Sequence, residues 1–157
     1  MRNKNIALTP PDTPVLVRGD PNVIEIAVRN LVENAIQHAP PGSTIGLRVG
    51  PDAHLEVVDA GPGVAAGLRD RIFEPFWSGD PHGVSAGLGL TIVSHVAERY
   101  GASIGVTAAP GGGARFTICF EPAAMRHSDL DAATARASVP AGLAHRRRRE
   151  ALDRAAD

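Results

Sequence analysis

Apolar residues with a helical period dominate the first third of the chain. They recur at intervals of three and four residues, the spacing of one helix face: Val23, Ile24, Ala27, Val28, Leu31, Val32, Ala35 and Ile36. Asp20 is a good N-cap and Pro21 suits the first helical turn, whereas Pro40, Pro41 and Gly42 end the pattern. The sequence therefore predicts a helix that begins after Asp20 and stops before Pro40.

Short runs rich in β-branched and alternating apolar residues indicate the strands. Five segments have this pattern: residues 15–17, 44–49, 54–59, 103–107 and 114–120. The residues before the first strand are interrupted by Pro10, Pro11 and Pro14, which predicts an irregular start. A second helix is predicted from Leu88 to Tyr100, ahead of Gly101. This mixture, with an adjacent strand pair at the end, predicts a two-layer α/β sandwich.

Two long segments lack a periodic pattern. Residues 60–87 are rich in Gly, Pro and Ala, as a loop over a site would be, and contain the cluster from Ile72 to Trp77. Residues 122–157 have few large apolar side chains, which predicts a largely disordered tail after a folded domain at residues 1–121. The run Arg146–Arg149 fits either a solvated tail or a patch for acidic surfaces.

The composition limits the classes of function. The 157 residues are 43% hydrophobic and 21% charged, enough for one ordinary core. A formal net charge of −1 gives no basic field for nucleic acid. No apolar run has membrane-spanning length, so we expect a soluble, cytoplasmic chain without membrane contact. The single cysteine, Cys119, excludes an intramolecular disulfide, and its apolar neighbours predict a buried strand position.

A polar stripe interrupts the first predicted helix. Asn30, Asn34 and either Gln37 or His38 share one side of it. Buried amides need partners, and Mg²⁺ with phosphate oxygens would suit them, because an amide oxygen is a hard neutral ligand. The alternative is an ordinary solvent-facing stripe.

A carboxylate and two glycines follow the third predicted strand, in Asp59-Ala60-Gly61-Pro62-Gly63. An ionised carboxylate only accepts hydrogen bonds, so Asp59 suits the exocyclic amino group of adenine and disfavours guanine. Gly61 and Gly63 would allow backbone to approach the base. By itself this pattern also fits a simple turn.

Glycines also precede the second predicted helix, in Ala86-Gly87-Leu88-Gly89-Leu90. Backbone N–H groups at such a helix start can bind phosphate. Glycine-rich helix starts are common without any ligand, so this signal is weak alone. The chain has no G-x-x-x-x-G-K-[ST] sequence, which excludes a P-loop.

The order of these clusters resembles the catalytic and ATP-binding domain of histidine kinases, within the gyrase, Hsp90, histidine kinase and MutL superfamily. The polar stripe resembles the N box, Asp59–Gly63 the G1 box, Ile72–Trp77 the F box and Gly87–Leu90 the G2 box. The resemblance extends from about Val15 to Phe120. It implies a Bergerat-type ATP-binding fold, with a mixed, mainly antiparallel sheet covered on one face by helices.

The resemblance also implies a role for each matching residue, with ATP and Mg²⁺ as cofactors. Asn34 would ligate Mg²⁺, Asn30 would support the phosphates and the metal, His38 would lie beside the nucleotide, and Asp59 would recognise adenine. The other implied ATP-binding residues are Gly61, Gly63, Phe76, Gly87, Leu88 and Gly89.

Four hydrophobic positions in the F and G2 boxes have expected structural roles. Phe73 and Phe76 would anchor a lid formed by about residues 64–86. We interpret Leu88 and Leu90 as packing residues.

Asn30 separates the kinases from their hydrolytic relatives. In the ATPases and anti-sigma-factor serine kinases, the residue four positions before the metal-binding asparagine is a glutamate that serves as base. Without that carboxylate, the resemblance implies transfer of the γ-phosphoryl group to a histidine, catalysed by positioning and Mg²⁺. Glu33 is expected to point from a different helix face.

Two positions depart from the family pattern. Family members commonly carry a basic residue where Gln37 stands and another where Ser78 stands. No Lys or Arg occurs from Ile72 through Glu98, so we expect weaker stabilisation of the transferring phosphoryl group. Arg71 is left open as a substitute.

The six histidines lack the helical context of a phosphoacceptor. We therefore expect a monomeric module that binds ATP without labelling itself. It would need a histidine-containing dimerisation domain, from a missing segment or a partner chain, and through it a response regulator in a phosphorelay. The alternative is a nucleotide-binding regulatory module without catalysis, or an anti-sigma-like interaction module.

Overall fold

The computed structural model describes residues 4–77 and 87–123. The strands in these ranges are β1 (Asn5–Thr9), β2 (Thr44–Val49), β3 (His54–Val58), β4 (Ser103–Ala108) and β5 (Ala114–Cys119). The helices are α1 (Pro21–His38) and α2 (Gly89–Arg99), with short 3-10 turns at Ala66–Leu68 and Arg71–Phe73. Both predicted helices are confirmed, and so are the last four predicted strands, with boundary differences of one residue.

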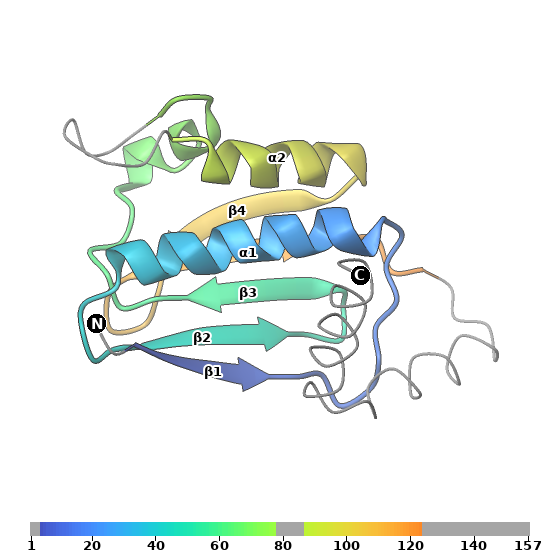
Figure 1. The fold of residues 1–157 in the computed structure, drawn as a ribbon, viewed down its shortest axis with the longest axis horizontal. Helices are drawn as coiled ribbons and strands as arrows, with labels where there is room; N and C mark the ends of the chain where they lie inside the picture. Colours follow the sequence, from blue (N-terminus) through green and yellow to red (C-terminus); the bar gives the residue numbers. More distant parts are fainter. Residues whose placement is uncertain (1–3, 78–86, 124–157) are drawn as a thin grey trace, which may run out of the picture. The chain divides into compact units, whose positions relative to one another are not determined.

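One mixed sheet carries the fold. Its strand order is β1-β2-β3-β5-β4; β1 is parallel to β2, and the other neighbouring strands are antiparallel. Figure 1 shows α1 and α2 on the same side of this sheet. The predicted two-layer sandwich with a mainly antiparallel sheet is therefore confirmed.

The core lies between the helices and one face of the sheet. Alternate strand residues face the helices, among them Ile45, Val57, Phe116 and Ile118, each at most 1% exposed. Leu31 and Val93 meet them from the helices, both fully buried. Each such side chain contributes on the order of 1.5–3 kcal/mol by its burial.

The ends of the two helices are held together at Asp20. The Asp20 carboxylate accepts a hydrogen bond from the backbone N–H of Asn22 at 2.8 Å, which confirms the predicted N-cap. The backbone N–H of Asp20 donates to the hydroxyl of Tyr100, just after α2, at 3.2 Å. The start of α1 is thereby fixed against the end of α2.

The prediction of a first strand at residues 15–17 is wrong. Val17 forms only an isolated bridge with Pro122, and the first strand is β1, in the segment predicted to be irregular. Val15 and Val17 instead pack against the core from its margin. The strand β1 was missed because it lies at the sheet edge and all five of its residues are exposed, so burial does not impose a strong pattern on it.

The prediction that Cys119 is buried is also wrong, because this side chain is exposed. Ile118 and Phe120 are buried against the helix layer. Successive strand residues point to opposite faces, so Cys119 points to the face that the helices leave open.

Neither helix in the described ranges has the length and hydropathy needed to span a bilayer. The predicted tail, including Arg146–Arg149, lies outside the described residues from position 124 onward.

Candidate functional site

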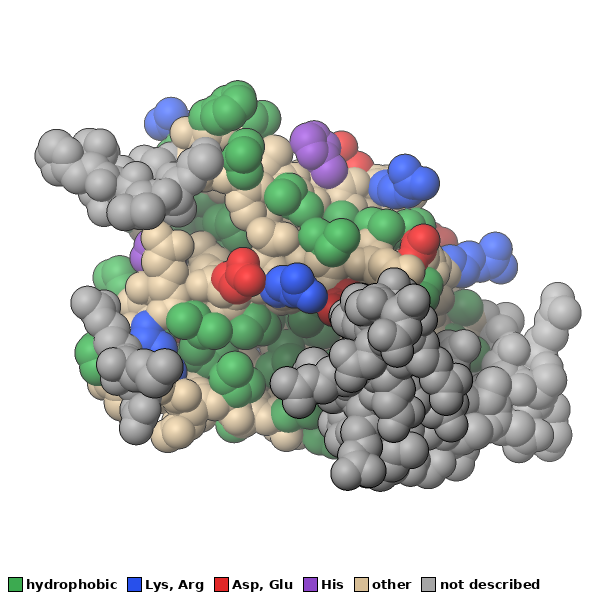
Figure 2. Space-filling model, in the orientation of Figure 1, with side chains coloured by type: hydrophobic (Ala, Val, Ile, Leu, Met, Phe, Trp, Pro, Cys, Tyr) green, Lys and Arg blue, Asp and Glu red, His purple; other side chains and the backbone are tan. Residues whose placement is uncertain are grey.

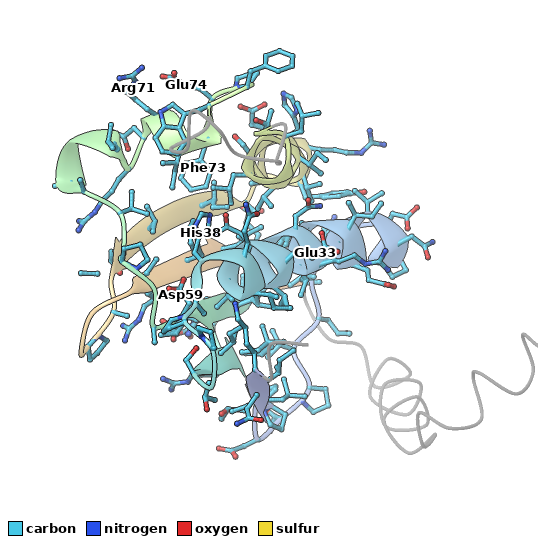
Figure 3. All side chains as sticks on the ribbon, turned by 60° about the vertical axis from the view of Figure 1, so that its left-hand side comes forward. Glu33, His38, Asp59, Arg71, Phe73 and Glu74 are labelled. Carbon is cyan, nitrogen blue, oxygen red and sulfur yellow. The ribbon has the colours of Figure 1, made fainter. Side chains whose placement is uncertain are left out.

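The predicted site residues converge at one end of the sandwich. The last turn of α1, the end of β3 and the turn at Arg71–Phe73 meet there. Figure 3 shows His38, Asp59 and Phe73 together on this side, whereas Glu33 lies further along α1 and away from them. The fold thus brings motifs that are separate in the sequence into one region.

Asp59 is the most constrained polar residue of this region. It is 4% exposed, and its Oδ1 accepts from the backbone N–H of Gly61 at 2.7 Å and of Ala114 at 3.3 Å. Its own N–H donates to the carbonyl of Ala114 at 3.0 Å. No residue in the described ranges donates to its second oxygen, Oδ2. One carboxylate oxygen is therefore fixed by backbone, and the other can accept from a ligand.

Close backbone contacts around Asp59 require glycine. A Cβ on Gly61 would lie 2.8 Å from the carbonyl oxygen of His38, and one on Gly113 would lie 2.0 Å from the carbonyl oxygen of Asp59. Gly63, with φ +74°, would meet the carbonyl oxygen of Gly113 at 2.9 Å. The loop after β3 thus packs between the end of α1 and the β4–β5 turn. Gly113 was not predicted as a site residue, because a run of three glycines is typical of a simple turn.

The two asparagines of the polar stripe on α1 differ in their hydrogen bonding. Asn30 is half-buried; its Nδ2 donates to the carbonyl of Ile26 at 2.8 Å. A Cβ on Gly89 would lie 3.1 Å from its Oδ1. The side-chain amide of Asn34, also half-buried, makes no hydrogen bond within the described ranges, and His38 is exposed. One turn after Asn30, Asn34 therefore offers a side-chain amide without a partner in the described ranges, as a ligand to a cation would need.

The F-box cluster is anchored by two of its side chains. Ile72 is 2% exposed, and the ring of Phe73 packs edge-on against Phe116 at 6.5 Å between centroids. Phe76 was also expected to anchor the loop, and this is wrong: its side chain is 77% exposed, with φ +61°. Its predicted contact with nucleotide stays a prediction.

The start of α2 has no side-chain cap. Leu88 precedes the helix, and within residues 4–77 and 87–123 no side chain accepts a hydrogen bond from the N–H groups of the first turn. Leu90 packs against the core as predicted, but Leu88 is 42% exposed and does not. An anion at this helix start would meet Gly89 and its neighbours.

Arg71 does not supply the missing basic charge from its observed position. Its Nε lies 3.9 Å from Oε2 of Glu74, and both side chains are about 60% exposed. Figure 3 shows this pair beyond Phe73, away from His38 and Asp59. Ser78, the other position of interest, lies outside the described residues.

No cluster of three or more His, Cys, Asp or Glu side chains within residues 4–77 and 87–123 could hold a metal ion. A cation at this site would need oxygen ligands from a bound nucleotide and water in addition to Asn34. This requirement fits Mg²⁺, which keeps several waters and is commonly bound through substrate phosphates.

Comparison with known proteins gives consistent matches. Residues 19–124 match the family model described as "Histidine kinase-, DNA gyrase B-, and HSP90-like ATPase". The sensor-like histidine kinase SenX3 of Mycobacterium tuberculosis is 36% identical over 141 residues, covering 85% of this chain and 34% of SenX3. The phosphate regulon sensor protein PhoR of Pseudomonas aeruginosa is 35% identical over 83% of this chain and 31% of its own length. The chain thus spans about a third of the length of these relatives.

Solved structures agree with the sequence matches. The mycobacterial sensor histidine kinase MprB is similar with a TM-score of 0.67 and 32% identity, covering 78% of this chain and 84% of that one. The full-length kinase ShkA in complex with AMPPNP has a TM-score of 0.66 and 29% identity, covering 79% of this chain and 27% of ShkA.

Proposed function

Because the chain belongs to the histidine kinase-, DNA gyrase B- and HSP90-like ATPase family, we propose that it is the ATP- and Mg²⁺-binding module of a two-component sensor histidine kinase. It transfers the γ-phosphoryl group of ATP to a histidine on a dimerisation domain, from which a response regulator receives it. The reaction takes place in the cytoplasm, where ATP is available. The observation that carries this proposal is the state of Asp59, with Oδ1 held by two backbone N–H groups and Oδ2 open.

Asp59 selects adenine through Oδ2. The exocyclic amino group of adenine donates to this oxygen, whereas the carbonyl of guanine at the same position would face a second acceptor. Since Oδ1 is already fixed, the carboxylate keeps its orientation before the ligand binds. Gly61 and Gly63 keep side chains away from the base.

Asn34 and the start of α2 hold the phosphate end. The Asn34 amide oxygen is a ligand of Mg²⁺, and Asn30 supports this region through its contact with Gly89. The free N–H groups at the start of α2 bind phosphate oxygens. His38, Phe76 and the glycines Gly87 and Gly89 border the nucleotide.

The chemistry is displacement at the γ-phosphorus. A ring nitrogen of the acceptor histidine forms a bond to phosphorus, the bond to the β–γ bridging oxygen breaks, and ADP leaves with the electron pair. The imidazole loses its N–H proton to solvent or to a base on its own domain. Asn30 cannot activate water as a carboxylate would, and the exposed Glu33 points elsewhere (Figure 3). Transfer is therefore favoured over hydrolysis.

The acceptor domain docks on an apolar area beside the phosphate end. Ile26, Leu88 and Ile92 are 46%, 42% and 38% exposed, and they lie around the contact of Asn30 with Gly89. Figure 2 shows apolar side chains exposed on the face formed by α1 and α2. Exposed apolar patches of this kind are typical of protein contacts. A histidine-bearing helix that covers these side chains would bring its imidazole close to the γ-phosphate.

Calorimetric titration with a non-hydrolysable ATP analogue and Mg²⁺ tests the site. We expect binding in the micromolar range, about −8 kcal/mol, and no binding of the GTP analogue. Asp59→Asn keeps the Oδ1 acceptor but replaces Oδ2 with a donor, so binding should be lost while the fold remains. Asp52→Asn, at an exposed position between β2 and β3, is the matched control. An unaltered folded chain that binds no nucleotide would overturn the proposal.

A further inference from the structure

Thr91 is the second buried polar side chain of the described ranges, after Asp59, at 6% exposed. It lies in the first turn of α2, among the buried apolar residues Val93, Val96 and Ala97. A buried hydroxyl loses water, so it must find a partner within the protein. Its partners show what it connects.

The Thr91 hydroxyl lies between two backbone carbonyls. Its Oγ1 is 3.2 Å from the carbonyl oxygen of Glu74 and 3.3 Å from that of Gly87. The bond to Gly87 is the local bond of a threonine to the preceding turn. The bond to Glu74 is long-range, because Glu74 lies 17 residues earlier, at the end of the F-box turn. One hydroxyl thus joins the F box to the G2 box.

The same two segments also meet through their backbones. A Cβ on Gly87, where φ is +65°, would lie 2.4 Å from the carbonyl oxygen of Trp77 and 3.0 Å from the carbonyl carbon of Phe76. The carbonyl of Glu74 also accepts from the N–H of Trp77 at 3.3 Å. Thr91 therefore completes a junction in which the turn from Glu74 to Trp77 is fixed against Gly87.

This junction sets the position of the phosphate-binding backbone. Gly87 and Gly89 lie between the Glu74–Trp77 turn on one side and Asn30 on the other. Val93, Val96 and Ala97 hold α2 through apolar packing, and apolar contacts are non-directional. The hydroxyl of Thr91 supplies a directional bond at this point.

We infer that Thr91 is a positioning residue: its hydroxyl holds the backbone from Gly87 to Gly89 in the orientation that presents N–H groups to the phosphates of ATP. The inference rests on the proposed function, because it assigns the phosphate end of that same site. It predicts that loss of the hydroxyl weakens recognition of phosphates and leaves recognition of adenine, at Asp59, unchanged.

The test compares ATP, ADP and adenosine on Thr91→Val and Thr91→Ser by calorimetry in the presence of Mg²⁺. Valine keeps the shape and removes the hydroxyl, whereas serine keeps the hydroxyl. We expect Thr91→Val to raise the Kd of ATP and ADP about tenfold, a shift well within calorimetric range, and to leave adenosine unchanged. Thr91→Ser should bind all three ligands like the unaltered chain.

A second pair isolates the hydroxyl if valine disturbs folding. Thr91→Ala and Thr91→Ser both lack the methyl group and differ only in the oxygen. A selective loss of ATP and ADP binding in the alanine variant, with serine normal, supports the inference.

If Thr91→Val and the unaltered chain bind ATP equally well, the inferred role of Thr91 is overturned, and the proposed function is not affected. An equal loss of ATP and adenosine binding overturns the inferred role too, because it indicates a general structural effect. If the unaltered chain binds no nucleotide, the proposed function fails, and the role of Thr91 fails with it.

Discussion

The side-chain oxygen of Asn30 and the Cα of Gly89 face each other so closely that a Cβ on the glycine would come within 3.1 Å of that oxygen. Two elements far apart in sequence, α1 and α2, are in contact here without an intervening side chain. The contact joins the amide that we propose to support the metal to the helix start that would hold phosphate. Gly89 is therefore a spacing residue between the two helices.

Gly89→Ala should therefore weaken ATP binding while the chain stays folded. The added methyl displaces the Asn30 amide or the first turn of α2, and we expect the Kd for ATP with Mg²⁺ to rise by about tenfold. Calorimetry measures the effect. Gly67→Ala is the control, because nothing lies within 4 Å of a Cβ there. Unchanged ATP binding in Gly89→Ala would count against the Asn30–Gly89 contact as part of the site.

Asn34→Ala should remove the dependence of ATP binding on Mg²⁺. The side chain of Asn34 makes no hydrogen bond within the described ranges, so its loss should change the thermal unfolding temperature little. Titrations with ATP in Mg²⁺ and in EDTA should differ for the unaltered chain and coincide for the variant. The neighbouring Glu33→Gln should behave like the unaltered chain, since Glu33 points away from the site (Figure 3). A retained Mg²⁺ effect in Asn34→Ala would contradict the assignment of the metal ligand.

Ile92→Glu should block transfer without affecting nucleotide binding. A charge in the apolar area opposes burial against a histidine-bearing helix, because a buried unpaired charge is costly. Phosphorylation of an added dimerisation domain with labelled ATP should fall at least about tenfold, as expected of a central contact in an interface. Leu8→Glu places the same charge on β1, where Leu8 is 63% exposed, and should leave transfer intact. Equal transfer by both variants would place the docking area elsewhere.

Gln37→Lys should raise the rate of transfer. The family resemblance implies a basic side chain at this position, and added positive charge near the phosphates would stabilise the transferring group. We expect an increase of about three- to tenfold in the single-turnover rate. Asn22→Lys, at the opposite end of α1, adds the same charge at a distance and should not change the rate. A rate for Gln37→Lys that matches the control variant would show that charge at this position does not limit catalysis.

The periodicity of the sequence was a good guide where one face of an element is buried. Leu31 and Ala35 on α1, and Phe116 and Ile118 on β5, are buried, and the elements that contain them were predicted within a residue of their ends. The edge strand β1 has no buried residue and was missed. Cys119 was placed wrongly because apolar neighbours on both sides hide the alternation of strand faces.

For the candidate site, the sequence motifs predicted residues but not their contacts. Asp59 and Asn34 were assigned from their motifs, and their roles toward a ligand stay predictions. The exposed position of Leu88 and Phe76 depends on where the helix starts and on a positive φ, which no pattern of residue types specifies. Thr91 was missed because its partners are backbone carbonyls, and a carbonyl has the same chemistry at every position of the sequence.

The two ends of the site are held in different ways, and the hydrogen bonds of Asp59 to Ala114 hold one of them. The proposed adenine end is built on the ladder that also joins β3 to β5. The proposed phosphate end depends on one helix start and a few loop contacts. Nucleotide binding should therefore order mainly the residues around the phosphates, and most of the entropy cost of binding should arise there. The rate at which ADP is exchanged for ATP would then depend mainly on the phosphate end, while the base stays bound in the same orientation.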